Sequence, residues 1–438
     1  MTTTANITGS ASDATPPEEA VVCALPGSPL AGALPGINAC VHCGFCLQAC
    51  PTYIAMEDEN DSPRGRIFLM RSLLEGTVAV DDPSVREHID RCLGCRACET
   101  ACPSGVPYGQ LLEATRATLT AVRPIPLLAR VMLWSFARPW MLAMAMAGGR
   151  LLAATPIPWL LSRLPGKIGF AMAMLASTES RLERGDYKPG TAATRGSFAL
   201  LEGCVMEGLF TATNRATERT LAVNGYERRE ARGQRCCGAL HAHAGDLATA
   251  RRLARRNIEA FERSGADFIV VNSAGCGAAV KDYGLLLEHD GEWAERASAV
   301  ATKARDVSEL LAAAGPMRGN PLPFRVTYDA PCHLQHAQRV VQAPLAVLSA
   351  IPELELVPLH ESDQCCGSAG IYNLIEPEVS NRVLEPKLAN IRATGALWVA
   401  TGNPGCMMQI GAGMLRAGIP ARTVHPVDLL DASYAARG

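Results

Sequence analysis

The sequence has little net charge and few aromatic residues. Its 438 residues contain 41 Lys and Arg against 43 Asp and Glu, a formal net charge of −2, and aromatic residues make up 5%. A charge balance so close to neutral gives no electrostatic reason to expect nucleic acid or an anionic membrane as the main partner, and we expect no nucleic-acid partner. Hydrophobic residues (48%) and charged residues (19%) occur in the proportions of a globular protein, which excludes a disordered chain.

Long uncharged apolar runs are also missing. In the most apolar stretch, residues 124–176, eleven residues separate Arg138 from Arg150 and twelve separate Arg150 from Arg163. Because a membrane-spanning helix needs about 20 consecutive apolar residues, no spanning segment is predicted. The stretch is interpreted either as a helical connector packed against the domains or as an amphipathic surface that meets a membrane or a partner subunit.

Export signals and familiar catalytic motifs are absent too. The first twenty residues have neither a basic start nor an apolar core, so residues 1–35 are expected to form a disordered polar tail of a cytoplasmic protein. No phosphate loop or nucleophile elbow is present, and Gly411, Gly413 and Gly418 do not complete a dinucleotide-binding loop. We therefore expect no catalytic residue for organic chemistry on this chain.

Cysteine is what the sequence has in excess. The count is 17, an odd number in a long chain without an export signal, which favours metal-binding thiolates over a disulfide scaffold. Cys23 stands alone. The other cysteines form four groups of four: Cys40, Cys43, Cys46 and Cys50; Cys92, Cys95, Cys98 and Cys102; Cys204, Cys236, Cys237 and Cys276; and Cys332, Cys365, Cys366 and Cys406.

The first two groups both have the spacing Cys-x2-Cys-x2-Cys-x3-Cys-Pro, which is typical of bacterial ferredoxins with two [4Fe–4S] clusters. One tight loop can hold three corners of a cube, and the fourth cysteine then reaches the neighbouring cube. Zinc usually takes paired Cys-x2-Cys and fits this repeated spacing poorly. The predicted ligand sets are crossed: Cys40, Cys43, Cys46 and Cys102 for one cluster, and Cys92, Cys95, Cys98 and Cys50 for the other.

Two arginines follow the first group. Arg64 and Arg66 are interpreted either as balancing the charge of the clusters or as part of a solvated helix start, with Pro63 in its first turn.

The last two groups belong to an internal repeat. Corresponding cysteines are 128, 129 and 130 residues apart, and the apolar segment 265–271 corresponds to residues 395–400. Residues 247–263 have helical spacing and precede a short apolar strand, so each unit is predicted to alternate strands and helices in a parallel α/β layer. The Gly after each Cys-Cys pair permits the turn that points both sulfurs the same way.

Each repeat is therefore predicted to hold one further iron–sulfur cluster or another metal. The predicted ligands are Cys204, Cys236, Cys237 and Cys276 in the first repeat, and Cys332, Cys365, Cys366 and Cys406 in the second. Whether a site takes iron or zinc stays open, and repeats that hold zinc would favour a structural docking module.

The predicted fold class is α+β and multidomain. An α-helical ferredoxin-type domain with two [4Fe–4S] clusters precedes two tandem α/β cysteine-rich domains. The predicted boundaries are 1–35 for the tail, 36–115 for the ferredoxin-type domain, 116–190 for the apolar helical connector, and 191–317 and 318–438 for the two cysteine-rich domains.

Several motifs resemble those of a known family: residues 40–46 (CVHCGFC), 63–67 (PRGRI), 201–204 (LEGC) and 365–370 (CCGSAG). The chain is similar along nearly its whole length to glycolate oxidase iron–sulfur subunits. Its repeats also resemble the CCG domains of heterodisulfide reductase, of lactate-utilisation proteins and of the anaerobic glycerol-3-phosphate dehydrogenase iron–sulfur subunit.

The resemblance implies an oxidoreductase subunit that transfers electrons only. Flavin-containing glycolate oxidase subunits would oxidise glycolate, and often D-lactate, and this chain would carry the electrons towards a respiratory quinone or another membrane acceptor. It would then lie peripherally on the cytoplasmic face of the inner membrane. A related lactate or glycerol-3-phosphate dehydrogenase remains an alternative.

One departure bears on a second alternative, a catalytic thiol–disulfide reductase of the heterodisulfide type. Domains of that type end in Cys-x2-Cys, whose last cysteine supplies a fifth thiolate, and the corresponding residues here are Ala279 and Gln409. Four histidines could be metal ligands or proton carriers near the clusters, or could serve in capping and packing: His241, His243, His333 and His336.

Overall fold

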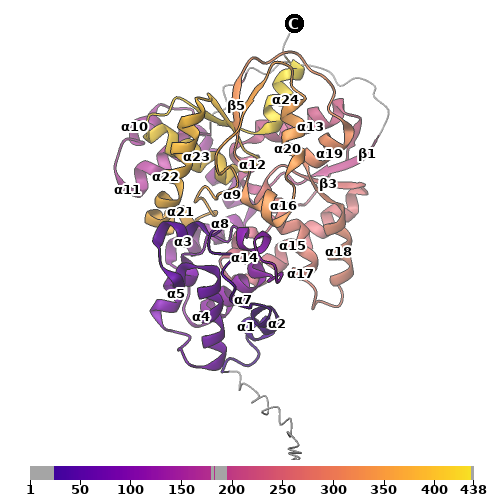
Figure 1. Cartoon of the computed structure of the whole chain (residues 1–438). Helices are drawn as coiled ribbons and strands as arrows, with labels where there is room; N and C mark the ends of the chain where they lie inside the picture. Colours follow the sequence, from indigo (N-terminus) through magenta and orange to yellow (C-terminus); the bar gives the residue numbers. More distant parts are fainter. Residues whose placement is uncertain (1–23, 179–181, 183–194, 436–438) are drawn as a thin grey trace, which may run out of the picture.

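The computed structural model describes residues 24–178, 182 and 195–435. These residues form a helical N-terminal domain, a helical connector and two α/β domains (Figure 1). The N-terminal domain lies at the bottom of the view, with the α/β domains above it. Cys23 and residues 1–22 lie outside the described part of the chain.

The N-terminal domain is built from short helices: α1 (Pro29–Gly32), α2 (Leu34–Asn38), α3 (Pro51–Met56), the 3₁₀ turn η1 (Glu59–Asp61), α4 (Pro63–Glu75), α5 (Pro83–Asp90), α6 (Ala97–Thr100) and α7 (Tyr108–Val122). Proline opens α3, α4 and α5, where its missing N–H costs no hydrogen bond. Ser62 caps α4 by accepting from the Gly65 N–H. α7 continues through the predicted domain boundary at residue 115.

The tail prediction is wrong for residues 24–35. This segment carries α1 and the start of α2, and the Leu30 side chain is fully buried in the N-terminal core. The Leu30 N–H also donates to Thr118 Oγ1 on α7 at 3.1 Å. The prediction extended the polar composition of the first twenty residues over an apolar segment that packs on the domain.

The connector contains α8 (Leu127–Phe136), α9 (Pro139–Ala153), α10 (Ile157–Leu161) and α11 (Gly166–Ala176). α9 packs so closely on the first α/β domain that a Cβ at Gly208 would come within 2.4 Å of Met146 Sδ. Phe170 and Ala173 of α11 join the core of the second α/β domain. Among the described helices none is by itself long and apolar enough to cross a membrane, and α7 with α8 meets the length and composition test only as a pair bent by 116°.

Each α/β domain contains a four-stranded, fully parallel sheet, which confirms the predicted α/β layers. The first has the order β2-β1-β3-β4 and the second β6-β5-β7-β8. The strands are β1 (Gly196–Leu200), β2 (Tyr226–Arg228), β3 (Phe268–Val271), β4 (Ala304–Asp306), β5 (Arg325–Tyr328), β6 (Glu355–Val357), β7 (Trp398–Ala400) and β8 (Arg422–Val424). The equal strand orders identify the two domains as structural repeats.

The helices of the first α/β domain are α12 (Cys204–Leu209), α13 (Thr211–Val223), α14 (Ala239–His243), α15 (Leu247–Ser264), α16 (Ala274–Lys281), α17 (Tyr283–Leu286), α18 (Ala294–Lys303) and α19 (Val307–Ala314). Those of the second are the π-helical turn η2 (His333–Ala337), α20 (Gln342–Ser349), α21 (Tyr372–Ile375), α22 (Pro377–Thr394), α23 (Pro404–Arg416) and α24 (Pro426–Ala435). α15 agrees with the predicted helix over 247–263.

The two α/β domains share one hydrophobic core. Side chains of both sheets, including Phe198, Val270, Val326 and Val424, belong to a single buried cluster. α24 closes the second domain against α13 of the first, where Arg219 Nη2 lies 2.6 Å from Asp431 Oδ2. The repeats are therefore fixed relative to each other, and so are the cysteine groups they carry.

Candidate metal centres

The most exposed cysteines line one cavity of the N-terminal domain. Cys40, Cys43 and Cys46 come from the loop between α2 and α3, and Cys102 follows α6; all four line this cavity together with Cys98. Gly44 adopts a positive φ of 87° in the loop, and a Cβ there would lie 2.8 Å from Arg64 Nη1. Burial raises the pKa of Cys46 to about 11, whereas Cys43 is exposed. The four thiols thus surround a common space at the molecular surface.

A second group of thiols lies deeper in the same domain. Cys50 stands at the start of α3, and Cys92, Cys95 and Cys98 come from the loop around α6; all four are buried. Burial raises the pKa of Cys98 well above its ordinary value, and the neighbouring Cys95, Cys92 and Cys50 raise it further. The Gly94 N–H donates to Cys92 Sγ at 3.4 Å. Four buried thiols with a backbone donor fit a cluster held away from solvent.

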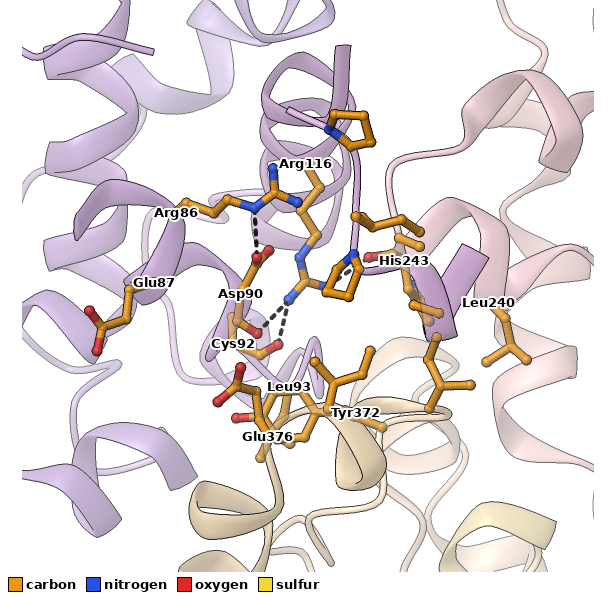
Figure 2. A pocket seen from close by; sticks show the side chains of 18 of the residues that line it. Arg86, Glu87, Asp90, Cys92, Leu93, Arg116, Leu240, His243, Tyr372 and Glu376 are labelled. Atoms are coloured by element: carbon orange, nitrogen blue, oxygen red, sulfur yellow. Dashed lines mark hydrogen bonds and ion pairs between the residues drawn. The ribbon is translucent and has the colours of Figure 1, made fainter. Parts of the chain in front are cut away.

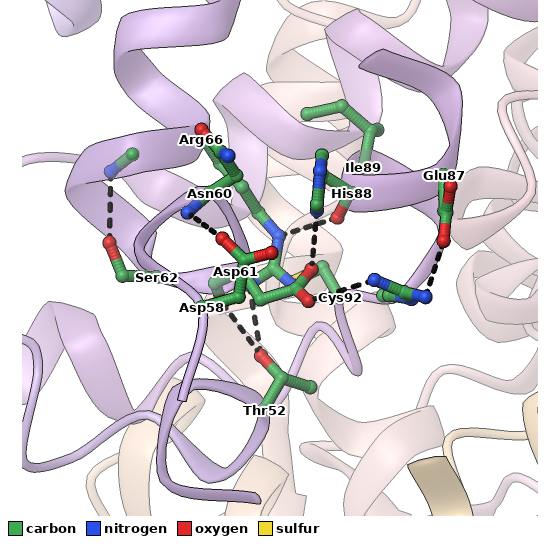
Figure 3. A network of polar contacts seen from close by, with 12 residues as sticks. Thr52, Asp58, Asn60, Asp61, Ser62, Arg66, Glu87, His88, Ile89 and Cys92 are labelled. Atoms are coloured by element: carbon green, nitrogen blue, oxygen red, sulfur yellow. Dashed lines mark hydrogen bonds and ion pairs between the residues drawn. The ribbon is translucent and has the colours of Figure 1, made fainter. Parts of the chain in front are cut away.

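A buried ionic network supports this second group (Figure 3). Arg66 Nη2 lies 3.1 Å from Asp61 Oδ1, and neither side chain is exposed to solvent. Arg66 Nη1 donates to Thr52 Oγ1 at 3.0 Å, and that hydroxyl lies 3.2 Å from Cys50 Sγ. Of the two interpretations of this arginine, the structure excludes the solvated helix start. Arg64, in contrast, is partly exposed and pairs with Glu59 at 2.6 Å.

Asp61 also attracts two further side chains. His88 Nδ1 lies 3.1 Å from Asp61 Oδ1, and Arg91 Nη1 lies 3.2 Å from Asp61 Oδ2. Asp58, Asp61 and His88 come close enough together to suggest a cation site. Two guanidinium groups already neutralise Asp61, so this cluster is an internal salt-bridge network and needs no metal ion.

The four thiols of the first α/β domain form a contiguous chain. Cys204 begins α12 after β1, Cys236 and Cys237 follow β2, and Cys276 lies on α16 after β3. The neighbouring Cys236 raises the pKa of Cys204, and Cys236 and Cys276 raise that of Cys237, so the four thiols lie next to one another. The sheet therefore brings all four predicted ligands to the carboxyl ends of its strands.

The second α/β domain repeats this arrangement. Its four thiols lie close enough for each to shift the pKa of the next in the order Cys332, Cys365, Cys366 and Cys406. Gly367, after the Cys-Cys pair, has a φ of 81°, and a Cβ there would lie 2.5 Å from the Ser380 backbone oxygen. The turn that points both sulfurs inward therefore requires glycine for its conformation and for space.

The two repeats differ beneath their cysteines. Asn257 on α15 donates to the Cys236 backbone oxygen at 3.1 Å. The residue at the corresponding position of α22 is Lys387, which pairs with Asp329 at 2.8 Å and donates to the backbone oxygens of residues 361 and 362. The cysteine spacing does not predict this pair. The signal in the sequence is that alignment of the repeats places Asp329 opposite Leu201.

The buried thiols of the N-terminal domain adjoin the second α/β domain. Cys95 shares a hydrophobic cluster with Cys365 and, at its edge, Cys332. Burial and the nearby Cys332 raise the pKa of Cys95 well above its ordinary value. Thr100 Oγ1 lies 2.8 Å from His336 Nδ1 across the same interface. Two groups that are more than 200 residues apart in the sequence are thus neighbours.

The first α/β domain is tied to its neighbours by polar contacts. Arg96 Nη1 lies 2.7 Å from Asp282 Oδ2. Between the two α/β sites, Asn403 Oδ1 accepts from the Gly275 N–H at 3.2 Å, and Asn403 Nδ2 donates to Cys406 Sγ at 3.4 Å. Asn403 therefore links the turn beside Cys276 to a thiol of the second domain, a role the repeat pattern did not reveal.

The four histidines lie at domain interfaces. His241 is buried, with Nε2 3.0 Å from the Leu133 backbone oxygen of the connector. His243 Nδ1 lies 3.0 Å from Glu113 Oε1, and its ring centre is 5.4 Å from that of His333. His333 Nδ1 lies 3.5 Å from Cys332 Sγ. These contacts show the histidines packed at the interfaces. Each group of four cysteines offers four sulfur ligands to a metal without a histidine.

The position of a fifth thiolate is filled differently in each repeat. Gln409 is fully buried; its Oε1 accepts from Asn373 Nδ2 and its Nε2 donates to Ser380 Oγ, both at 2.8 Å. Ala279 offers no donor atom. A satisfied amide and a methyl group cannot replace a thiolate, so each α/β site has four thiol ligands to offer.

A cavity of about 460 Å³ lies where the N-terminal domain meets both α/β domains and the start of the connector (Figure 2). Arg116 Nη2 donates to the Cys92 backbone oxygen at 2.7 Å, and Arg116 Nη1 donates to the His243 oxygen at 2.9 Å. Tyr372 and Glu376 line the other side, and burial raises the pKa of Glu376 above its ordinary value. The cavity thus combines apolar walls with polar groups beside Cys92.

Family models match both kinds of domain. Residues 36–106 match the 4Fe-4S dicluster domain, and residues 198–281 and 326–411 match the cysteine-rich domain CCG. A solved structure of a hypothetical protein from Helicobacter pylori superimposes on 73% of this chain and 75% of its own, with a TM-score of 0.42 and 11% identity.

Curated relatives are more informative. The chain is 37% identical over 411 residues to the probable glycolate oxidase iron–sulfur subunit of Bacillus subtilis (strain 168), covering 89% of this chain and 92% of that one. It is 33% identical to the glycolate oxidase iron–sulfur subunit of Escherichia coli (strain K12), covering 86% and 90%. Lactate utilization protein A of Geobacillus sp. (strain WCH70) is 29% identical over 53% of this chain and 98% of its own. The chain therefore belongs to the family of glycolate oxidase iron–sulfur subunits.

Proposed function

We propose that this protein is the electron-transfer subunit of a membrane-associated glycolate oxidase, a complex that oxidises glycolate or D-lactate. Flavin-containing partner subunits deliver the electrons, and a respiratory quinone or another membrane acceptor receives them. The two relatives named as glycolate oxidase iron–sulfur subunits support this role. The chain itself carries no catalytic residue for the hydroxyacid, and it lies peripherally on the cytoplasmic face of the inner membrane.

The ligand assignment is part of the proposal. One [4Fe–4S] cluster is held by Cys40, Cys43, Cys46 and Cys102, and the other by Cys50, Cys92, Cys95 and Cys98. The shared cavity of the first set and the mutual influence of the buried thiols in the second set support the crossed arrangement. Each CCG domain holds a further iron–sulfur cluster through its four thiols. Such clusters supply one-electron transfer when bound.

The observation that carries the proposal is the contact between the N-terminal domain and the second CCG domain at Cys95, Cys332 and Cys365. A surface-exposed site containing Cys43 is suited to receive electrons from a partner protein. The buried site lies next in line, and the site of the second CCG domain follows. In this proposal three cysteine groups serve as consecutive electron-transfer sites between the protein surface and its interior.

The acceptor is proposed to bind in the cavity beside Cys92. Its volume of about 460 Å³ falls within the usual range of small-molecule sites, and its walls are mainly apolar. Glu376, whose pKa burial raises, could hold a proton there. On the connector side the cavity is lined by residues 124–126 and Ala129, and the acceptor would enter past them.

The test is to purify the chain anaerobically with and without its flavoprotein partners. Together they should reduce a dye with glycolate, whereas the isolated chain should not. Glycolate-dependent dye reduction by the isolated chain would refute this division of labour. About eight irons per chain would mean that only the N-terminal pair is filled, and about sixteen that all four sites are.

Metal content, disulfide turnover and substrate preference separate the alternatives. Substantial zinc in the CCG domains would favour a docking module. Turnover of a disulfide substrate that Cys366→Ser abolishes, and that does not depend on the flavoproteins, would favour a thiol–disulfide reductase. Preference for D-lactate or glycerol 3-phosphate by the assembled complex would identify a related dehydrogenase.

A further inference from the structure

The connector exposes an unusual amount of apolar surface. More than half of the large hydrophobic side chains that are exposed in the described part of the chain lie between residues 124 and 176. On α9, which has no buried residue, Trp140, Met144 and Leu151 are 62%, 68% and 74% exposed. Their spacing places all three on one side of the helix. α9 thus presents an apolar stripe to solvent instead of to the core.

The neighbouring helices share this property. Leu127, Val131 and Trp134 form an exposed stripe on α8, and α10 and α11 expose Trp159 and Ile168. α9 contacts α8, α10 and α11, so the apolar side chains belong to one group of adjoining helices. α10 and α11 lie at the left edge of the molecule in Figure 1. We call these helices, α8 to α11, the connector surface.

The charge on this segment has one sign only. Residues 127–176 contain no Asp or Glu, but they contain four arginines and Lys167. In the described part of the chain no ion pair engages any of these five cations. Elsewhere exposed arginines commonly pair with carboxylates, as Arg296 does with Glu262 at 2.7 Å. Among the described residues the connector surface is therefore apolar and net cationic, and Glu376 lies near enough to Lys167 for that cation to counteract the rise in its pKa.

Tryptophan and arginine occur together on this surface. The Arg138 guanidinium lies 4.0 Å from the Trp134 ring centre, and the Arg163 guanidinium lies 3.9 Å from that of Trp159. Three of the five tryptophans of the chain, Trp134, Trp140 and Trp159, belong to the connector. Indole rings favour the boundary between headgroups and acyl chains, and arginine next to them meets lipid phosphate.

We propose that the connector surface docks this protein on an anionic lipid bilayer, with the apolar stripes of α8 to α11 at the acyl boundary and the arginines among the headgroups. The inference rests on the proposed function, because a membrane acceptor is what brings the chain to a bilayer. A protein partner would normally offer charged side chains of both signs at its rim. The uniform positive charge matches an anionic lipid surface better.

The experiment measures co-sedimentation of the full chain with vesicles. Wild-type protein should bind vesicles of phosphatidylcholine containing about one third phosphatidylglycerol, and bind phosphatidylcholine alone at least roughly ten-fold more weakly. Brominated acyl chains should quench the tryptophan fluorescence. Trp140→Ser/Met144→Ser/Leu151→Ser and, separately, Arg130→Glu/Arg150→Glu should each weaken binding by roughly ten-fold or more.

Matched controls come from other exposed positions. Leu285→Ser/Leu397→Ser and Arg232→Glu alter exposed residues of the CCG domains and should leave vesicle binding unchanged. Iron content and glycolate-dependent reduction of a soluble dye by the assembled complex should remain at wild-type levels in all variants. If the assembled wild-type complex did not reduce the dye with glycolate, the proposed function would be overturned but the docking surface would not.

Three results would overturn the docking surface itself. The first is wild-type protein that does not sediment with anionic vesicles. The second is equal binding of the wild type and the connector variants. The third is a connector variant that keeps its vesicle binding but releases the flavoprotein partners, because the surface would then be a protein interface.

Discussion

Lys387 Nζ lies 2.8 Å from Asp329 Oδ1 in the second CCG domain, and both side chains are almost completely buried. Thr401 Oγ1 donates to the other carboxylate oxygen at 2.9 Å. The pair lies beneath the Cys365–Cys366 turn, where the first CCG domain has Asn257 and Leu201. The repeats therefore place unlike groups behind sites that present the same four thiols.

Breaking this pair should destabilise the protein strongly. Lys387→Met leaves the Asp329 carboxylate buried without its cation, which costs about 3–5 kcal/mol. Removing both charges with Lys387→Met/Asp329→Leu should cost less than the single change, because no unpaired charge remains. Anaerobic urea unfolding of the full chain measures both. A double variant less stable than Lys387→Met would show that the pair is not the stabilising element.

The crossed ligand sets predict which spectral signal each cysteine controls. Cys50→Ser should remove the same electron paramagnetic resonance component as Cys95→Ser, because both thiols lie in the buried group. Cys102→Ser should instead match Cys43→Ser, since these two line the exposed cavity. If Cys50→Ser altered the component that Cys43→Ser alters, the uncrossed assignment would hold.

Gly367 offers a test of the second CCG site that touches no thiol. Gly367→Ala forces a Cβ against the Ser380 backbone oxygen and strains a φ of 81°. The variant should lose roughly four irons per chain while it keeps both N-terminal signals. Gly395→Ala is the matched control, because its φ is also positive but its Cβ would meet open space. Equal iron loss in both variants would assign the effect to backbone strain alone.

Asp306 should make stability depend on pH. Burial raises the pKa of this carboxyl to about 6, against the Ser308 hydrogen bonds that lower it. A folded-state pKa above the unfolded value means that the native state binds the proton more tightly, so stability falls as the pH rises from about 4 to about 6. The free energy of unfolding of the wild type should therefore fall by about 3 kcal/mol relative to that of Asp306→Asn over this range.

The control for this pH dependence is Asp82, another helix N-cap. Hydrogen bonds from Ser84 lower the pKa of its exposed carboxyl, so its contribution has the opposite sign and is present above the unfolded pKa. Denaturation midpoints between about pH 2.5 and about pH 7.5 for the wild type, Asp306→Asn and Asp82→Asn separate the two directions, because the Asp82 contribution is lost only as the pH falls below about 4. A flat difference between the wild type and Asp306→Asn would contradict the prediction.

Ligand spacing and the repeat could be predicted because they are local. Cys-x2-Cys-x2-Cys encodes a loop whose thiols are close whatever the rest of the chain does, and Gly367 follows from the turn it must make. The periodic pattern of residues 247–263 likewise specified a helix that burial of one face stabilises. The alternation of helical and apolar strand segments sufficed for the parallel α/β layers.

Tertiary packing decided what lies next to what. The neighbourhood of Cys95 and Cys332, the pairing of Lys387 with Asp329 and the burial of Leu30 each join segments whose separation in sequence carries no information about distance. Such contacts depend on side-chain shape across whole domains, which a linear pattern does not encode. The apolar composition of residues 124–176 was visible from the start, but only the folded chain decides which of its faces are covered and which meet solvent.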